Sequence, residues 1–103
     1  ITLVEPLDFF DFLQIEKNAR IVLTDSGGVQ EETCVLGVPC VTLRDNTERP
    51  ETLDVGANIL SGINPEKIVD SVSIMYTKKR DWLNPFGLGD ASKKIVKIIQ
   101  EVV

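Results

Sequence analysis

The stretch TDSGGVQEE, residues 24–32, decides how this chain is built. It follows the apolar residues 21–23 and leads into a helical pattern, so it predicts a strand that turns into a helix at paired glycines. The first N–H groups of a helix have no partner inside it, and the helix dipole places partial positive charge there. Because Gly27 and Gly28 have no Cβ, a phosphate can come close to those amides. The turn of residues 26–28, called the Ser26 turn below, therefore predicts an anion site made of main-chain donors.

Two side chains of the same stretch can extend this site. Ser26 can cap the helix or donate its hydroxyl to a phosphate oxygen. Glu32 lies in the second helical turn and can accept hydrogen bonds from a ribose diol, as acidic residues do in dinucleotide-binding folds. The alternative is an ordinary serine cap and a tight turn with Glu32 in solvent, because Gly-Gly before a helix is a weak signal by itself.

A second polar stretch, LRDNTERPE at residues 43–51, follows the next apolar run. Its arginines and acidic side chains are also typical of a solvated loop with local ion pairs. The functional alternative is a bidentate contact from Arg49 to a pyrophosphate or a sugar. Glu48 can then fix the arginine, and Thr47 can donate its hydroxyl. Residues 44–51 are called the arginine loop below.

Hydrophobic periodicity and turn signals predict an alternating order of strands and helices. We expect strands at residues 1–4, 21–24, 41–43 and 58–60, and helices at 8–19, 26–36, about 65–80 and from 90 to the end. This order implies right-handed crossovers and a parallel, Rossmann-like sheet flanked by helices. In the first helix, capped by Asp8, we expect most aromatic side chains to join the core.

The position of the polar stretches relative to the strands predicts where a ligand binds. Ligands on parallel sheets bind beyond the carboxyl ends of the strands. Glu5, Asp25 and Arg44 each follow a predicted strand, so the loops after them should share one rim. The Ser26 turn and the arginine loop should therefore face the same cleft.

Composition narrows the class of protein. The chain has 103 residues, 43% of them hydrophobic, with a mean hydropathy of +0.06, which fits one small globular α/β domain. Its formal charge of −5 gives no basic footprint for nucleic acid and argues against anionic membrane surfaces. No apolar run approaches the roughly 18 residues that a membrane helix needs. The first residue is Ile1, and no signal-peptide pattern follows, so we interpret the chain as an excised segment.

The cysteine and histidine content excludes some chemistry. Cys34 and Cys40 do not have Cys-x-x-Cys spacing, and the chain contains no histidine, so the sequence predicts no zinc site. Two small buried thiols in a reduced compartment are the expected outcome. Proton transfer would fall to carboxylates or a lysine.

Together, these motifs resemble the non-hydrolysing UDP-N-acetylglucosamine 2-epimerase family. The likeness rests on DSGGVQEE, on LGVP at residues 36–39 and on LRDNTERPE, and it continues in GAN at 56–58 and NPFGLG at 84–89. It covers essentially all 103 residues but only the C-terminal part of the family's much longer chain. It therefore implies that residues 1–103 are the C-terminal UDP-binding segment of a two-domain, glycosyltransferase-B-like parent whose N-terminal catalytic domain is absent.

The resemblance also implies an activity for the parent and a role for this segment. The family interconverts UDP-N-acetylglucosamine and UDP-N-acetylmannosamine by eliminating UDP to a 2-acetamidoglucal and adding it back, with no metal or redox cofactor. The main acid and base groups lie outside this segment, so no catalytic residue is assigned here and the isolated chain is expected to be inactive. The implied substrate-binding residues are Ser26, Gly27 and Gly28 for the diphosphate, Glu32 for the ribose, Phe12 for the uracil, Leu7 for the base edge, and Arg49 for the charged or sugar end.

Two other functions stay open at this point. One is a related hydrolysing epimerase or glycosyltransferase, and the other is a non-catalytic nucleotide-binding module. The resemblance further implies a cytoplasmic enzyme of cell-surface polysaccharide biosynthesis. Its expected partners are a UDP-sugar, the parent's N-terminal domain and, in a homodimer, a second copy of the chain.

Overall fold

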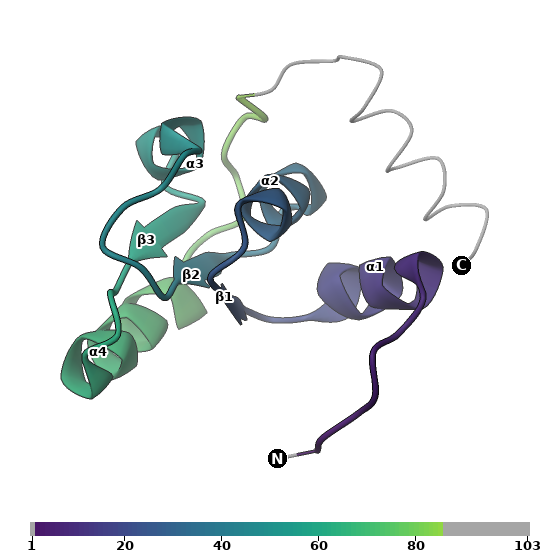
Figure 1. Cartoon of the computed structure of the whole chain (residues 1–103). Coiled ribbons are helices and arrows are strands. Elements are labelled where there is room, and N and C mark those ends of the chain that lie inside the picture. The colour runs from purple at the N-terminus through teal and green to yellow at the C-terminus, as the bar shows by residue number, and fades with distance from the viewer. Residues whose placement is uncertain (1, 86–103) are drawn as a thin grey trace.

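The computed structural model describes residues 2–85 as a small α/β unit (Figure 1). The elements follow in the order α1 (Phe9–Asn18), β1 (Val22–Thr24), α2 (Gly27–Leu36), β2 (Cys40–Thr42), α3 (Pro50–Asp54), β3 (Asn58–Leu60) and α4 (Pro65–Tyr76). No helix in residues 2–85 has the length and the apolar content that crossing a bilayer requires.

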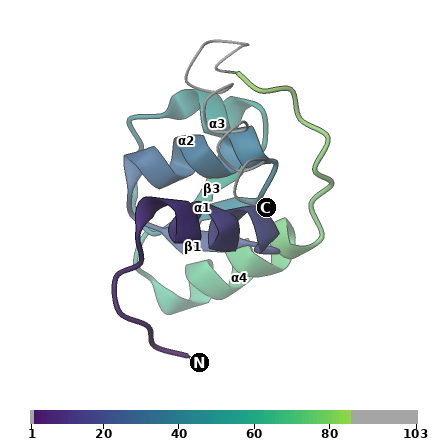
Figure 2. The same ribbon diagram turned by 90° about the vertical axis from the view of Figure 1, so that its right-hand side faces the viewer.

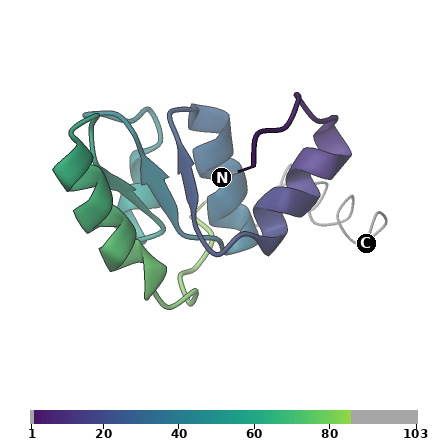
Figure 3. The same ribbon diagram turned by 90° about the horizontal axis from the view of Figure 1, so that it is seen from below.

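The three strands form one parallel sheet in the order β1-β2-β3. Val22 pairs with Cys40, and Cys40 pairs with Asn58, so the strands run in step. Helices α2 and α4 lie on opposite faces of the sheet (Figure 2), and α1 lies beyond α2 (Figure 3). All three residues of the central strand β2 are buried, as expected when both faces of a parallel sheet are covered. The predicted parallel, Rossmann-like sheet flanked by helices is confirmed.

The helix ends also follow the sequence signals. Asp8 Oδ1 accepts from the Asp11 N–H at 2.9 Å, so α1 is capped as predicted. Asn64 caps α4, with Pro65 as the first helical residue. Helix α2 ends at Gly37, whose φ of 76° lies in the left-handed region that favours glycine. These local signals place the helices that flank the sheet.

The predicted strand at residues 1–4 is wrong for the part that the structure describes. Residues 2–7 have no regular structure, and they run away from the other elements (Figure 1). Leu3 is 93% exposed and Val4 is 68% exposed. A β-branched run forms a strand only beside a neighbouring strand, and none pairs with it among the described residues. Glu5 therefore does not follow a strand and does not join the rim.

Three further predictions need correction or fall outside the structure. The short helix α3, which begins at Pro50, was predicted as loop, although proline is common at a first helical position. Most aromatic side chains of α1 were expected in the core, with Phe12 reserved for the uracil, but Phe9 and Phe10 are exposed by about half. The core instead takes Leu13 from this helix. The helix predicted from residue 90 lies outside the described residues.

Candidate functional site

The Ser26 turn forms the start of α2 directly after β1. Ser26 Oγ accepts from the Val29 N–H at 3.3 Å, so the serine caps the helix as predicted. The Ser26 N–H donates to Thr24 Oγ1 at 3.1 Å, so this amide already has a partner within the protein. Gly27 and Gly28 open the helix, where N–H groups have no intrahelical partner. Of the three predicted main-chain donors, the two glycine amides are therefore the ones available for an anion.

The arginine loop lies beside this turn, as the order of strands predicts. A Cβ placed on Gly27 would lie 3.8 Å from the guanidinium carbon of Arg49. The Arg49 side chain forms an ion pair with Glu31 on α2, and its Nη1 lies 3.8 Å from Glu48 Oε2. The turn and the arginine loop thus lie close together as predicted, and the cleft between them stays a prediction. A cation thus stands next to the positive end of a helix, and the two together favour an anionic ligand.

A buried polar network that the sequence did not predict holds the arginine loop in place. Gln30, only 1% exposed on α2, accepts from the Thr47 hydroxyl and, at 3.2 Å, from Asn58 Nδ2. Asn58 Nδ2 also donates to Thr52 Oγ1 at 3.1 Å, and Asn58 Oδ1 accepts from Thr42 Oγ1 at 2.7 Å. The network therefore ties α2 to β2, β3 and α3 through neutral hydrogen bonds.

The same network fixes the backbone of Arg49 at both sides. The Arg49 N–H donates to Thr47 Oγ1 at 3.0 Å, and the Arg49 carbonyl accepts from Thr52 Oγ1 at 2.7 Å. The Thr47 hydroxyl was expected to reach a ligand, but it donates to Gln30 instead. The signal in the sequence was the position of Gln30. This polar residue lies one turn after the capping Ser26, on the face of the helix that packs against the sheet. Buried hydrogen bonds thus fix the backbone of the loop at Arg49, while the Arg49 guanidinium group stays partly exposed.

On the other side of α2, Glu32 meets Glu16 of α1. The Glu16 side chain is buried, and Oε2 of Glu32 is enclosed without a hydrogen-bond donor among the described residues. Burial first, and the neighbouring carboxyl group of Glu32 second, raise the pKa of Glu16 to about 8. In the sequence, Glu16 shares one face of the predicted helix with Phe9, Phe12 and Leu13, and this pattern gives it no role of its own. Glu32 is half-buried beside this carboxyl group and is not simply solvated.

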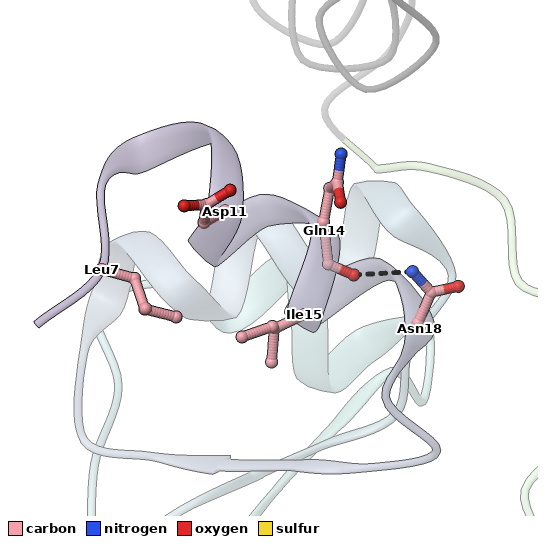
Figure 4. Close-up of a pocket in the computed structure, with 5 residues that line it drawn as sticks. All are labelled: Leu7, Asp11, Gln14, Ile15 and Asn18. Carbon is pink, nitrogen blue, oxygen red and sulfur yellow. Dashed lines mark hydrogen bonds between the residues drawn. The ribbon is translucent and has the colours of Figure 1, made fainter. Parts of the chain in front are cut away.

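The two residues predicted for the base lie on and before α1. Leu7 and Phe12 are 38% and 40% exposed, so both can still contact a ligand. A hollow of about 380 Å³ runs along α1, lined by Leu7, Asp11, Gln14, Ile15 and Asn18 (Figure 4). Asn18 Nδ2 donates to the Gln14 carbonyl at 2.8 Å at one end of it. The lining includes neither Phe12 nor the Ser26 turn, so this hollow is separate from the predicted anion site.

The cysteines offer little reactivity. Cys34 and Cys40 are both buried and unpaired. Burial raises the pKa of each thiol to about 11, so both stay protonated near neutral pH. The predicted buried thiols are confirmed. Within residues 2–85, no group of three or more histidine, cysteine or acidic side chains is placed to hold a metal ion.

A family model and individual relatives that match this chain carry the same name. Residues 1–100 match the family model described as UDP-N-acetylglucosamine 2-epimerase. A protein of that name from Methanocaldococcus jannaschii is 61% identical over 99 residues, which are 96% of this chain and 27% of the relative. The one from Yersinia pestis is 41% identical, over 97% of this chain and 28% of the relative. The chain thus spans about a quarter of the length of these relatives.

Solved structures with the same name have the same fold. The M. jannaschii UDP-GlcNAc 2-epimerase in complex with UDP-GlcNAc and UDP superposes with a TM-score of 0.82 at 60% identity, covering 95% of this chain and 27% of that one. The enzyme from Neisseria meningitidis bound to UDP-GlcNAc gives a TM-score of 0.76 at 38% identity, covering 95% and 28%. The resemblance drawn from the motifs and the predicted glycosyltransferase-B-like fold class are confirmed.

Proposed function

This chain belongs to the UDP-N-acetylglucosamine 2-epimerase family, and we propose that it is the UDP-binding segment of an isomerase that interconverts UDP-N-acetylglucosamine and UDP-N-acetylmannosamine. The observation that carries the proposal is the position of the Arg49 guanidinium beside Gly27, at the start of α2. A cation, two glycine amides without intrahelical partners and a helix dipole converge there, and a diphosphate is the part of a UDP-sugar that such a site recognises.

In this proposal the segment holds the leaving group. When the bond between C1 and the UDP oxygen breaks, negative charge develops on the diphosphate, and donors that are already oriented stabilise it without rearranging. The Gly27 and Gly28 amides supply these donors, together with the Ser26 amide if it leaves Thr24. Arg49 exchanges its ion pair with Glu31 for one with the diphosphate or the adjoining sugar.

The nucleoside takes the other end of the site. Glu32 accepts from the ribose hydroxyls, Phe12 lies against the uracil ring, and Leu7 lies near the base edge through its backbone or its apolar surface. Charge and hydrogen bonds thus fix the diphosphate and the ribose, while apolar contact fixes the base.

The acid and base groups that remove the proton at C2 and return it to the other face belong to a further N-terminal domain of the parent. This segment alone should therefore bind UDP but not epimerise a UDP-sugar. That domain is the expected partner of the chain, with a second copy of the chain in a homodimer. The parent is proposed to act in the cytoplasm. Product analysis on the parent separates it from a hydrolysing relative, because hydrolysis releases free N-acetylmannosamine whereas epimerisation retains the UDP-sugar.

Titration calorimetry with UDP tests the binding role. The 103-residue chain should bind UDP, and Glu32→Ala should weaken binding about tenfold or more, because a hydrogen bond to a charged group contributes roughly 1.5–3 kcal/mol. Glu66→Ala, in the exposed first turn of α4 on the opposite face of the sheet, is the matched control and should leave binding unchanged. Equal affinity in the wild type and Glu32→Ala would contradict the assigned role of Glu32, and no binding of UDP would contradict the proposed function.

A further inference from the structure

The contact between α1 and α2 brings two carboxyl groups together, and no cation among residues 2–85 is paired with them. Glu16 is 2% exposed, and neither of its oxygens meets a hydrogen-bond donor among the described residues. Oε2 of Glu32 is enclosed in the same way, whereas the Glu32 residue as a whole is only half-buried. One member of the pair is thus sealed inside the protein, and the other reaches the surface beside the proposed ribose position.

Such a pair is stable only if it shares a proton. Two ionised carboxylates in contact repel one another, and neither can donate a hydrogen bond to the other. The more deeply buried acid keeps the proton, because burial disfavours its charged form, and the pKa of Glu16 is accordingly raised to about 8. Within the described part of the chain, Cys40 on β2 is a further titratable group whose pKa responds to the charge of Glu16. Its pKa of about 11 keeps it neutral over the same range, so it supplies no charge to balance a Glu16 carboxylate.

We propose that Glu16 is a positioning residue for nucleotide binding: its carboxylic acid donates a hydrogen bond to the enclosed oxygen of Glu32 and so directs the rest of that carboxylate toward the ribose. This role rests on the proposed function, in which Glu32 holds the ribose. Glu16 does not touch the ligand. It fixes the rotamer of a side chain whose enclosed oxygen has no other hydrogen-bond partner among residues 2–85.

The shared proton makes ribose recognition depend on pH. With the proton present, the pair carries one negative charge, located on Glu32, and Glu32 is held in place. As the pH rises through the pKa of Glu16, the hydrogen bond is lost and a second negative charge appears beside Glu32. The repulsion moves Glu32 away from its binding position. Recognition of the ribose hydroxyls should therefore be intact below pH 8 and should weaken above it.

Two substitutions separate the positioning role from simple packing. Glu16→Gln keeps a donor for Glu32 but does not titrate. Glu16→Met has a similar length but neither donates nor titrates. The readout is the ratio of the affinities for UDP and 2′-deoxy-UDP, measured by calorimetry from pH 6.5 to 9 on the 103-residue chain. Only the ribose hydroxyl differs between the two probes, so the ratio reports on Glu32 and cancels general loss of fold.

The expected results differ among the three proteins. The wild type should prefer UDP by about tenfold at pH 6.5, as one hydrogen bond to a charged group allows, and should lose most of this preference by pH 9. Glu16→Gln should keep the preference over the whole range, and Glu16→Met should lack it throughout.

An unchanged ratio in both variants, with the same pH profile as the wild type, overturns the positioning role and leaves the proposed function standing. If the wild type binds neither probe, the proposed function itself has failed, and the positioning role fails with it. Should Glu16→Met not fold, the comparison of the wild type with Glu16→Gln across pH still decides the question.

Discussion

Helix α2 is held on its two sides by different kinds of polar contact. Toward β3 and α3, Gln30 joins a network of neutral amides and hydroxyls in which Asn58 meets three side-chain partners. Toward α1, Glu32 meets the buried acid Glu16. The neutral network keeps its geometry at any ordinary pH, whereas the carboxyl pair keeps its geometry only while it holds one proton. The diphosphate side of the site should therefore be insensitive to pH, and the ribose side should not.

Removing the centre of the neutral network should have the largest effect. In Asn58→Leu the Thr42, Thr52 and Gln30 side chains lose their buried partner, so the free energy of unfolding should fall by about 3 kcal/mol or more. Urea unfolding followed by circular dichroism measures the loss. Asn18→Leu is the matched control, because this amide lies exposed on α1 and donates to the Gln14 carbonyl of its own helix, so the expected change is within about 0.5 kcal/mol. Similar losses in both variants would contradict the importance of the network.

Stability should depend on pH through Glu16. Its pKa is 4.5 ordinarily and about 8 when folded, so the folded state holds a proton that the unfolded state has already lost between these values. The free energy of unfolding should therefore fall by about 3.5 kcal/mol as the pH rises from 5 to 8, and level off above that. Glu16→Gln should remove this contribution. Urea midpoints at each pH measure it, and the same slope in both proteins would rule the contribution out.

Arg49→Lys should weaken binding of UDP by weakening contacts to the diphosphate, which lies on the side of α2 that the neutral network holds. A lysine keeps the charge but loses the planar pair of donors, so affinity should fall about fivefold to tenfold. The loss should be the same at pH 6.5 and pH 9, since the Arg49 backbone is held by Thr47 and Thr52 and not by a titrating group. Calorimetry at both pH values is the check. A loss that changes strongly with pH would show that the two sides of α2 are coupled.

The smallest effect is expected from Glu31→Gln. Glu31 forms an ion pair with Arg49, and a ligand must compete with it. Removing the charge should tighten UDP binding about twofold at low salt, and the gain should shrink at high salt because partly exposed ion pairs are weak and screened. Weaker binding in Glu31→Gln would mean that Glu31 orients the arginine instead of competing for it.

Local sequence signals account for most of the fold and for one side of the site. Asp8, Ser26 and Asn64 each cap the predicted helix, and Gly37 ends one. The meeting of the Ser26 turn with the arginine loop follows from parallel strand order, because loops after adjacent parallel strands share an edge. Both kinds of inference need only neighbours in sequence or a rule of topology.

The remaining contacts depend on packing that no local signal describes. Gln30 and Asn58 lie 28 residues apart, and their hydrogen bond exists only because α2 covers the sheet next to β3. Glu16 fits an amphipathic pattern, and nothing in that pattern shows that it faces another acid. The strand that was wrongly predicted at residues 1–4 also shows the role of packing. Its β-branched sequence favours a strand, but no neighbouring strand pairs with it among the described residues.

The most direct test is where a diphosphate binds on the chain. Backbone amide shifts from ¹⁵N-labelled protein, titrated with UDP and separately with uridine, report this residue by residue. The account predicts that UDP moves the Gly27 and Gly28 amide signals strongly downfield, that uridine leaves them nearly unchanged, and that both ligands shift residues of α1. If UDP instead shifts the cationic surface of Arg20, Lys78 and Arg80 and leaves the two glycines unaffected, the account is wrong.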